Sequence, residues 1–433
     1  MATYGSIPGV QITTSTGTVA GVTIGRAQYL TLVGVGGPDA DAEPNEVIRI
    51  DDRSDARETF GEDSDIAEAY ERALANGANP DFINAVKAET TSETVTETDS
   101  SGTLANWPIV PDPERITVLD DGTELDVEFV YEDTITPEEE GVFYINPNTG
   151  DYDIDIDATE IEIDYTYADW DSAIEATMDA LDEGQFGVIT PLTTAPGPIT
   201  TLEGVIEQMR GEMKMAVSLF AAEPNATDGY PWIDVGDYES GFSDDTLFAV
   251  GPTTLEEPDM NAGYGVGALG AVAGLFAGND TTEPVYDNTV SGIAGLHQEL
   301  TRADVADLRD EYTIPLRDTG TVRLKDNHST YDQDTEGGWE RDYFRRRIVD
   351  LTTVTTFLIA RRQLGGILDD DTIDDVEDAL FAELRELEGD GLLEAGEQDV
   401  NVYRKDDRTI GIDAQITPFG VAKGADVELE VIA

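Results

Sequence analysis

Hydrophobic periodicity changes twice along this chain of 433 residues, and those changes constrain its fold more than any other feature. Between residues 26 and 90, and again after residue 170, short apolar runs alternate with stretches whose apolar residues recur every three or four positions. Between residues 115 and 169 the period is two, and turn-forming residues separate the alternating segments. Because a period of 3.6 indicates helices and a period of two indicates half-buried strands, the pattern predicts an α/β chain with a small β-rich domain inserted in it.

The fold class we expect is therefore a multidomain α/β (α+β) protein with an inserted β-rich domain and extended terminal arms. Residues 91–98 are rich in Thr and Glu, and we interpret them as a linker. The predicted division is an N-terminal extended arm at 1–25, the first part of the α/β core at 26–90, an inserted outer domain at 91–169, the continuation of the core at 170–262, a C-terminal domain at 263–424 and a C-terminal strand arm at 425–433.

The chain is strongly acidic, with 92 Asp and Glu against 25 Lys and Arg and a formal net charge of −67. Such a charge repels itself in dilute buffer, yet 39% of the residues are hydrophobic and the apolar periodicity is not that of a disordered tail. We interpret the chain as a folded protein adapted to molar salt, in which electrostatic screening acts within a few ångströms. An acidic mesophilic protein and a protein that binds much calcium are the alternatives.

Composition also excludes several classes of function. The acidic surface argues against nucleic acid and anionic membranes as partners, since both attract Lys and Arg. The chain has no Cys, which excludes disulfides, thiolate catalysis and Cys-based metal sites. The longest apolar run, Gly263 to Gly278, is shorter than the roughly 20 residues that span a bilayer, so we expect no membrane insertion. The first residues have neither the basic nor the apolar part of a secretion signal, so we expect synthesis in the cytoplasm.

One glycine-rich segment, Gly265-Val-Gly267-Ala-Leu-Gly270, matches the spacing of a dinucleotide-binding loop. The preceding predicted strand ends near Val250, too far upstream for the tight strand–turn–helix that this loop needs. We therefore interpret these glycines as positions of close backbone packing. A halophilic α/β enzyme with a dinucleotide-type glycine-rich segment is the alternative function, and an exported adhesive protein is a third.

Acidic runs and histidines provide no metal or catalytic site. Asp151, Asp153, Asp155 and Asp157 alternate with apolar residues, which places them on the solvent face of a strand, and the run lacks the Gly and terminal Glu of a calcium-binding loop. Neither His297 nor His328 has metal-ligand spacing or a nucleophile motif beside it. Hence we predict no catalytic residue, no cofactor and no metal.

An arginine cluster lies on a long helix that we expect to begin at Trp339. Six of the 25 basic residues lie between residues 341 and 362. One interpretation is that they pair with carboxylates of the same chain; the other is that they form a basic surface for an acidic partner. The apolar face of this helix carries Phe344, Ile348, Leu351, Thr355 and Leu358, and the arginines are Arg341, Arg345, Arg346, Arg347, Arg361 and Arg362.

Three segments carry a family resemblance: Val272–Asp280 (VAGLFAGND), Trp339–Asp342 (WERD) and Arg347–Asp350 (RIVD). In this order they resemble the contractile tail sheath proteins of myovirus-type phages and of related contractile injection particles. The resemblance covers residues 263 to 433, and more weakly residues 26 to 90. With the acidic composition, it indicates a sheath protein of a halophilic archaeal virus or its host, with a conserved α/β sheath core.

The resemblance implies a mechanical protein and not an enzyme. Many copies would form a helical homopolymer around a tail tube, with baseplate and tail terminator proteins as further partners. Contraction would drive the tube through the envelope of a target cell. The location would be the virion tail, after synthesis in the host cytoplasm.

The resemblance also gives roles to the arms and to the arginines. Unpaired terminal strands can add to sheets of neighbouring copies, and in this family the inner part of the conserved domain packs on the tube, partly through charge. The residues that we expect in the arm contacts are Val10, Ile12, Val19, Val22, Ile24, Val427, Leu429 and Val431. The candidate tube-contacting residues are Arg345, Arg347, Arg361 and Arg362.

Overall fold

A computed structural model gives the structure of the chain. It describes residues 2–7, 10–14, 28–62, 64–130, 135–137, 139–155, 160–222, 245–255, 266–279, 284–296, 300–310, 313–331, 342–362, 370–396, 398–406 and 409–419.

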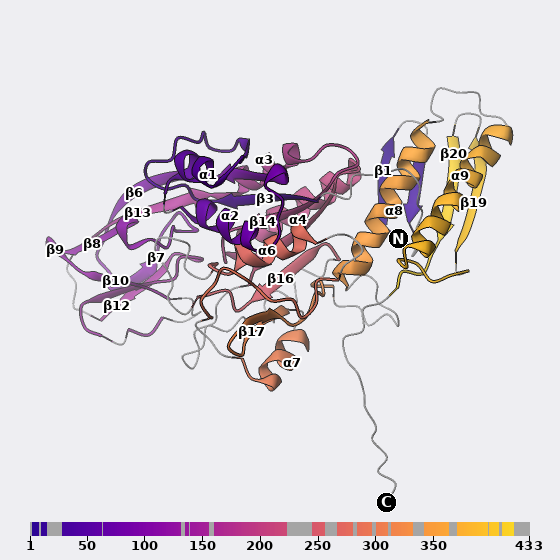
Figure 1. Ribbon diagram of the computed structural model, residues 1–433. Coiled ribbons are helices and arrows are strands. Elements are labelled where there is room, and N and C mark those ends of the chain that lie inside the picture. Colours follow the sequence, from indigo (N-terminus) through magenta and orange to yellow (C-terminus); the bar gives the residue numbers. More distant parts are fainter. Residues whose placement is uncertain are drawn as a thin grey trace, which may run out of the picture.

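An eight-stranded sheet forms the centre of the protein (Figure 1). Its strands lie in the order β18-β17-β16-β15-β14-β3-β5-β4. The inner strands are all parallel, whereas β4 and β18 pair antiparallel at the two edges. The bounds are β3 Gln28–Gly34, β4 Val47–Arg49, β5 Ile83–Lys87, β14 Phe186–Pro191, β15 Met215–Ala221, β16 Leu247–Gly251, β17 Thr313–Asp318 and β18 Val322–Leu324.

Helices cover both faces of this sheet, as the near-continuous burial of its inner strands requires. Alternate residues of a strand point to opposite faces. Leu30 and Leu32 of β3 pack with α2 and α6, whereas Val33 packs with α3 and α4. The mixed α/β fold class that the sequence predicts is confirmed. The helices are α1 Arg53–Phe60, α2 Asp65–Ala75, α3 Trp170–Ala176, α4 Pro196–Gly211, α6 Leu269–Gly278 and α7 Arg302–Asp310, with 3₁₀ turns at Pro80–Phe82, Pro113–Arg115 and Thr177–Ala180.

The glycine-rich segment forms α6, which packs against α2 through a row of small residues. Every residue from Leu269 to Ala277 is buried. A Cβ atom added at Gly270, Gly274 or Gly278 would lie within 2.8 Å of backbone atoms of the facing helix and of the residues that follow it. The interpretation of close backbone packing is confirmed. The facing pairs are Gly270 with Ala69, Gly274 with Ala73, and Gly278 with Gly77.

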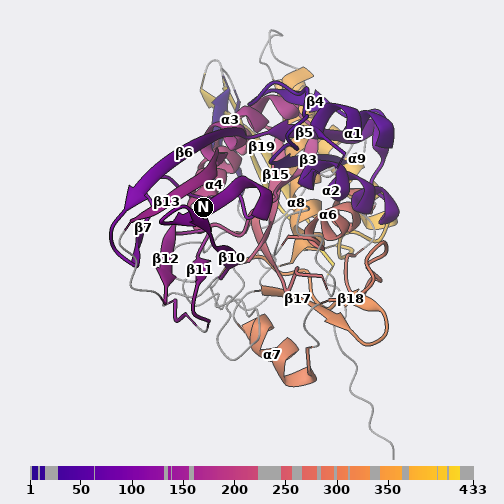
Figure 2. The same ribbon diagram turned by 90° about the vertical axis from the view of Figure 1, so that its left-hand side faces the viewer.

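The strands between residues 89 and 169 form two four-stranded sheets with a hydrophobic core of their own. Figure 2 shows these strands on the side of the molecule that faces the viewer. The linker predicted at residues 91–98 is wrong: Glu89–Glu97 is strand β6, which pairs along its whole length with β13. The sheets are β10-β11-β12-β7 and β6-β13-β8-β9, with β7 Ser101–Thr103, β8 Ile116–Asp120, β9 Thr123–Glu124, β10 Asp126–Phe129, β11 Val142–Ile145, β12 Asp151–Ile154 and β13 Ile161–Asp169.

The C-terminal helices and a further sheet form the opposite end of the molecule (Figure 1). This sheet has the order β1-β2-β20-β19, so it joins the two ends of the chain. Residues 2–7 and 10–14 of the predicted N-terminal arm form a hairpin, and its second strand pairs in parallel with β20 of the same chain. The strands are β1 Ala2–Ile7, β2 Val10–Thr14, β19 Asp399–Asp406 and β20 Thr409–Gln415, and the helices are α8 Tyr343–Arg362 and α9 Asp370–Gly389.

Candidate functional site: a buried arginine–aspartate joint

The candidate site lies where α8 enters the core. Asp342 directly precedes the helix, and its Oδ1 atom accepts hydrogen bonds from the Arg345 backbone N–H at 3.2 Å and from Asn327 Nδ2 at 3.4 Å. The first of these bonds satisfies a backbone donor that the first helical turn leaves without an intrahelical partner, and the second ties the helix start to Asn327. The helix was expected from Trp339; the described helix begins at Tyr343, and residues 339–341 lie outside the described residues.

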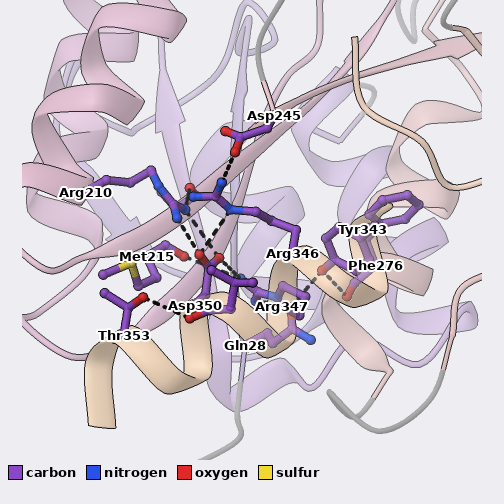
Figure 3. A network of polar contacts seen from close by, with 12 residues as sticks. Gln28, Arg210, Met215, Asp245, Phe276, Tyr343, Arg346, Arg347, Asp350 and Thr353 are labelled. Atoms are coloured by element: carbon purple, nitrogen blue, oxygen red, sulfur yellow. Dashed lines mark hydrogen bonds and ion pairs between the residues drawn. The ribbon is translucent and has the colours of Figure 1, made fainter. Parts of the chain in front are cut away.

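Asp350 is the centre of a buried ionic network (Figure 3). Its carboxylate accepts hydrogen bonds from Arg346 Nε at 3.1 Å and from both terminal nitrogens of Arg210 on α4, of which Nη1 lies at 3.3 Å. Arg347 Nη1 lies 3.7 Å from Asp350 Oδ2. Arg346 also pairs with Asp245, just before β16. The network therefore ties α8 to α4 and to the sheet.

Arg347 makes a second set of contacts toward β3 (Figure 3). Its guanidinium donates to Gln28 Oε1 and, at 3.4 Å, to the Met215 carbonyl. The Tyr343 hydroxyl lies 2.9 Å from Gln28 Oε1 and 3.0 Å from the carbonyl oxygen of Phe276. One turn of α8 thus contacts three parts of the core: β3, β15 and α6.

The centre of the network is enclosed, whereas the Asp245 side chain at its edge is 23% exposed. The exposed fraction of the side chain is 0% for Arg346, 1% for Arg347 and Asp350, and 3% for Arg210. Burial raises the pKa of Asp350, and the guanidinium groups of Arg210 and Arg347 act against that rise. Burial also raises the pKa of Tyr343 to about 12, so this hydroxyl keeps its proton near neutral pH. The geometry is that of a rigid joint with no open space for a substrate.

Further along α8, buried threonines take the place of apolar residues. Thr352, Thr353, Thr355 and Thr356 are each buried, and each hydroxyl donates to the carbonyl four residues earlier at 2.8 or 2.9 Å. Their polar atoms are therefore satisfied within the helix, which lets α8 be enclosed on several sides. The helix continues from the core to the C-terminal sheet. There, residues of α8 pack with α9, β19 and β20 in one hydrophobic cluster.

The four candidate tube-contacting arginines do not share one surface. Arg347 is buried in the network, so the expectation that it faces a partner is wrong for this structure. Arg345 is partly buried beside the helix start. Arg361 is half exposed, pairs with Glu183 and lies over the Phe357 ring, 5.7 Å from its centroid. Arg362 is the last residue of α8, and its side chain lies outside the described residues.

Only part of the predicted arm contacts falls in described segments. Val10 and Ile12 lie on β2, where they are paired with Ile410 and Ile412 of β20. The other predicted arm residues lie outside the described residues: Val19, Val22, Ile24, Val427, Leu429 and Val431.

Sequence reasoning missed the partners that bury the arginines. Gln28, Arg210 and Asp245 lie in three distant segments, and no local pattern connects them with α8. The one available signal was Asp350 itself, an acid four residues after Arg346 and within an otherwise apolar and Thr-rich stretch. Such a spacing places both side chains on one helix face, which favours internal pairing.

The alternative sites are not supported by the structure. Gly267 and Gly270 lie at the buried start of α6 and not in a loop at a strand end, while Gly265 lies outside the described residues. The described acids of the predicted strand face, Asp151 and Asp153, alternate with buried residues on β12 as expected. Among the residues that the structure describes, no three His, Cys, Asp or Glu side chains gather in a metal-binding geometry. The same residues include no helix both long and apolar enough to cross a membrane.

The whole chain is similar in fold to contractile sheath proteins of known structure. It matches the contracted helical sheath of the anti-feeding prophage with a TM-score of 0.57 and 13% identity, over 98% of this chain and 99% of that one. It matches the contracted PVC sheath of an extracellular contractile injection system with a TM-score of 0.58 and 11% identity, over 99% of this chain and 98% of that one. For a sheath tail protein from Desulfitobacterium hafniense the TM-score is 0.54 and the identity 11%, over 94% and 100% of the two chains. No known sequence family and no curated protein matches the chain.

Proposed function

We propose that this chain is the subunit of a contractile sheath and not an enzyme. The observation that carries the proposal is the extent of the likeness: nearly the entire chain, including the inserted sheets and the C-terminal unit, aligns with nearly the entire length of sheath subunits. In this role, many copies form a helical sleeve around a tail tube. A baseplate starts contraction, and a terminator closes the distal end. One solved neighbour is itself part of an anti-feeding prophage baseplate.

Head-to-tail contacts between copies build a helical sleeve when the rotation from one copy to the next does not close into a ring. Contraction is then a change of packing between rigid bodies, and the energy comes from better contacts in the contracted lattice. The buried joint supports this mechanism, because it fixes α8 to the core, so a load on the C-terminal sheet is transmitted to the core without local unfolding. The strong acidity supports assembly in molar salt, in the tail of a halophilic archaeal virus or of a host-encoded injection particle, after synthesis in the host cytoplasm.

The C-terminal sheet offers a place for linkage between subunits. Within the described part of the chain, nothing pairs with the outer edge of β19, whose Arg404 and Lys405 are exposed. The C-terminal arm alternates apolar residues with Glu428 and Glu430. A half-buried strand of this kind in one copy can add to the open edge of β19 in the next by strand addition.

Deletion of residues 425–433 tests this linkage. We expect the truncated protein to fold as a monomer, because it keeps every residue of the hydrophobic clusters that the described part of the chain forms. It should fail to form sleeves, which electron microscopy of the full-length and truncated proteins side by side would show. A second variant keeps the length of the arm and replaces Val427, Leu429 and Val431 by Thr. This change removes the apolar face of the arm, so it should also prevent assembly. Sleeves of normal appearance from the truncated protein would refute the linkage.

The tube contact is proposed for the exposed end of α8. Arg361 is the described candidate whose side chain is half exposed, and Arg362 follows it. Charge reversal of both residues to Glu should abolish co-assembly with an acidic tube protein, measured by co-sedimentation in molar salt, while self-assembly remains. Charge reversal at Arg49, an exposed arginine on β4, is the control. Co-assembly that survives the double reversal would show that the tube binds elsewhere.

A further inference from the structure

The inserted domain carries an open strand edge along β6. This strand is the first in the sheet order β6-β13-β8-β9, and it pairs with β13 on one side over its whole length, Glu89–Glu97. Within the described part of the chain, no strand pairs with its other side. Figure 2 shows β6 at the outer margin of the inserted domain. The backbone N–H and C=O groups that point outward from β6 can therefore pair with a further strand.

The side chains of β6 leave this edge accessible. The four residues from Glu89 to Ser92 are exposed, and so are Thr94 and Thr96. Because successive side chains point to opposite faces of a sheet, four consecutive exposed residues show that both faces are open at this end of the strand. Val95 packs against the hydrophobic core of the inserted domain, which holds the strand in place.

The strand lacks the features by which proteins commonly block such an edge. These features are a short strand, a Pro, a Lys or a bulge. Strand β6 has nine residues with neither Pro nor Lys, and its register with β13 has no shift. Its charged residues are Glu89, Glu93 and Glu97, which recur every fourth position and so lie on one face.

The carboxylate of Glu93 is a fixed negative charge in the middle of this row. Its Oε2 atom accepts hydrogen bonds from the Tyr165 hydroxyl and from Asn106 Nδ2, both at 2.7 Å. These hydrogen bonds lower the pKa of Glu93, so this side chain is ionised near neutral pH.

The three glutamates act against pairing of β6 with a second copy of itself. Two antiparallel β6 strands that pair over their full length place Glu89 opposite Glu97, and Glu93 opposite Glu93. Like charges directly opposite each other destabilise a pair of strands, whereas opposite charges stabilise it. The edge therefore disfavours a second β6 and favours a strand with basic side chains at the matching positions.

We propose that the outer edge of β6 binds an extended segment of another protein, with Lys or Arg opposite the three glutamates, by strand addition. The segment extends the four-stranded sheet by one strand, and its backbone pairs with the open edge. The surface belongs to a single subunit, so the inference does not depend on the formation of sleeves.

Two nine-residue peptides test the proposal on the full-length protein. One has Lys at its first, fifth and ninth positions with Thr and Val between them, and the other has Glu at the same three positions. We expect saturable binding of the Lys peptide, measured by the fluorescence anisotropy of a dye on the peptide, and much weaker binding of the Glu peptide. Hydrogen exchange should slow at the outward-facing amides of β6 when the Lys peptide binds, and should not change in α1.

A charge exchange on the protein checks the pairing. The double variant Glu89→Lys, Glu97→Lys should bind the Lys peptide about tenfold more weakly than the parent protein does, and the Glu peptide more tightly. The control is Glu114→Lys with Glu124→Lys, two exposed glutamates of the inserted domain that lie outside β6. This control should bind both peptides as the parent protein does.

Four results would overturn the proposal. The first is no saturable binding of the Lys peptide, and the second is equal binding of the two peptides by the parent protein. The third is binding that leaves hydrogen exchange in β6 unchanged, which would indicate adsorption by charge alone. The fourth is protection of the β6 amides that rises with protein concentration without peptide, which would show that the partner is a second copy of the chain.

Discussion

At the scale of single residues, α8 shows why a charged sequence does not identify a surface. The run Arg345-Arg346-Arg347 resembles an exposed basic patch, yet two of the three side chains are among the most deeply buried in the described part of the chain. Helical periodicity assigns residues to faces, but it does not say which face another segment will cover. The groups that cover this one, Arg210 and Gln28, come from segments more than 130 residues away, so the sequence alone could predict internal pairing only as an alternative.

Asp350→Asn should be strongly destabilising. The change removes the negative charge and replaces one carboxylate oxygen by an NH₂ group, which cannot accept from the guanidinium groups of Arg210 and Arg346, so these buried groups lose their compensating charge. Breaking a buried ion pair on one side costs about 3–5 kcal/mol of unfolding free energy, which denaturant titration in molar salt would measure.

The exposed pair of Arg361 with Glu183 is the matched control on the same helix. Arg361→Gln should change the free energy of unfolding by less than about 1 kcal/mol, because solvent screens an exposed pair. Equal losses in the two variants would contradict the account of the joint. So would an Asp350→Asn protein as stable as the parent.

At the scale of elements, small residues decide how closely α2 and α6 approach. The glycines of α6 recur every fourth position, as do Ala69, Ala73 and Gly77 of the facing segment. The α6 glycines therefore lie on one helix face and Ala69 and Ala73 on one face of α2, while Gly77 follows the end of α2. The two backbones pack directly on one another. The sequence predicted close backbone packing for the glycine-rich segment, but its pattern did not indicate that α2 is the helix against which it packs.

Gly274→Ala should destabilise the protein although Ala favours helices. The added Cβ would lie 2.4 Å from the Ala73 carbonyl oxygen, so the two helices must separate. We expect a loss of about 1–3 kcal/mol in the free energy of unfolding, typical of overpacking. Gly204→Ala in the exposed part of α4 is the control, since its Cβ would meet nothing within 4 Å. It should gain about 0.5–1 kcal/mol from helix propensity. Denaturant titration compares the two, and a stabilised Gly274→Ala protein would contradict the packing.

Other elements show where local patterns suffice and where they do not. Strands β3, β14 and β15 can be predicted from local sequence, because buried parallel strands are continuous apolar runs. Strand β6 was missed because its Thr and Glu residues resemble a linker. Its structure depends on pairing with β13, more than 60 residues later. The N-terminal hairpin was predicted as an extended segment, but its partner β20 lies at the other end of the chain.

At the scale of the whole molecule, charge and assembly are connected. A subunit with a net charge of −67 repels every other copy in dilute buffer. In molar salt the screening length is about 3 Å, so contacts between copies depend on packing and strand pairing instead of long-range charge. The multidomain α/β architecture followed from the periodicity of the sequence. The joint at α8 did not, because it rests on contacts between distant segments.

The central claim is that these subunits polymerise into a sleeve, and negative-stain electron microscopy of the concentrated protein in molar KCl tests it most directly. The account predicts hollow striated tubes or stacked rings, and their absence from a parallel sample in dilute buffer. A population of single subunits that shows no ordered assembly at any protein concentration in molar salt would contradict the claim.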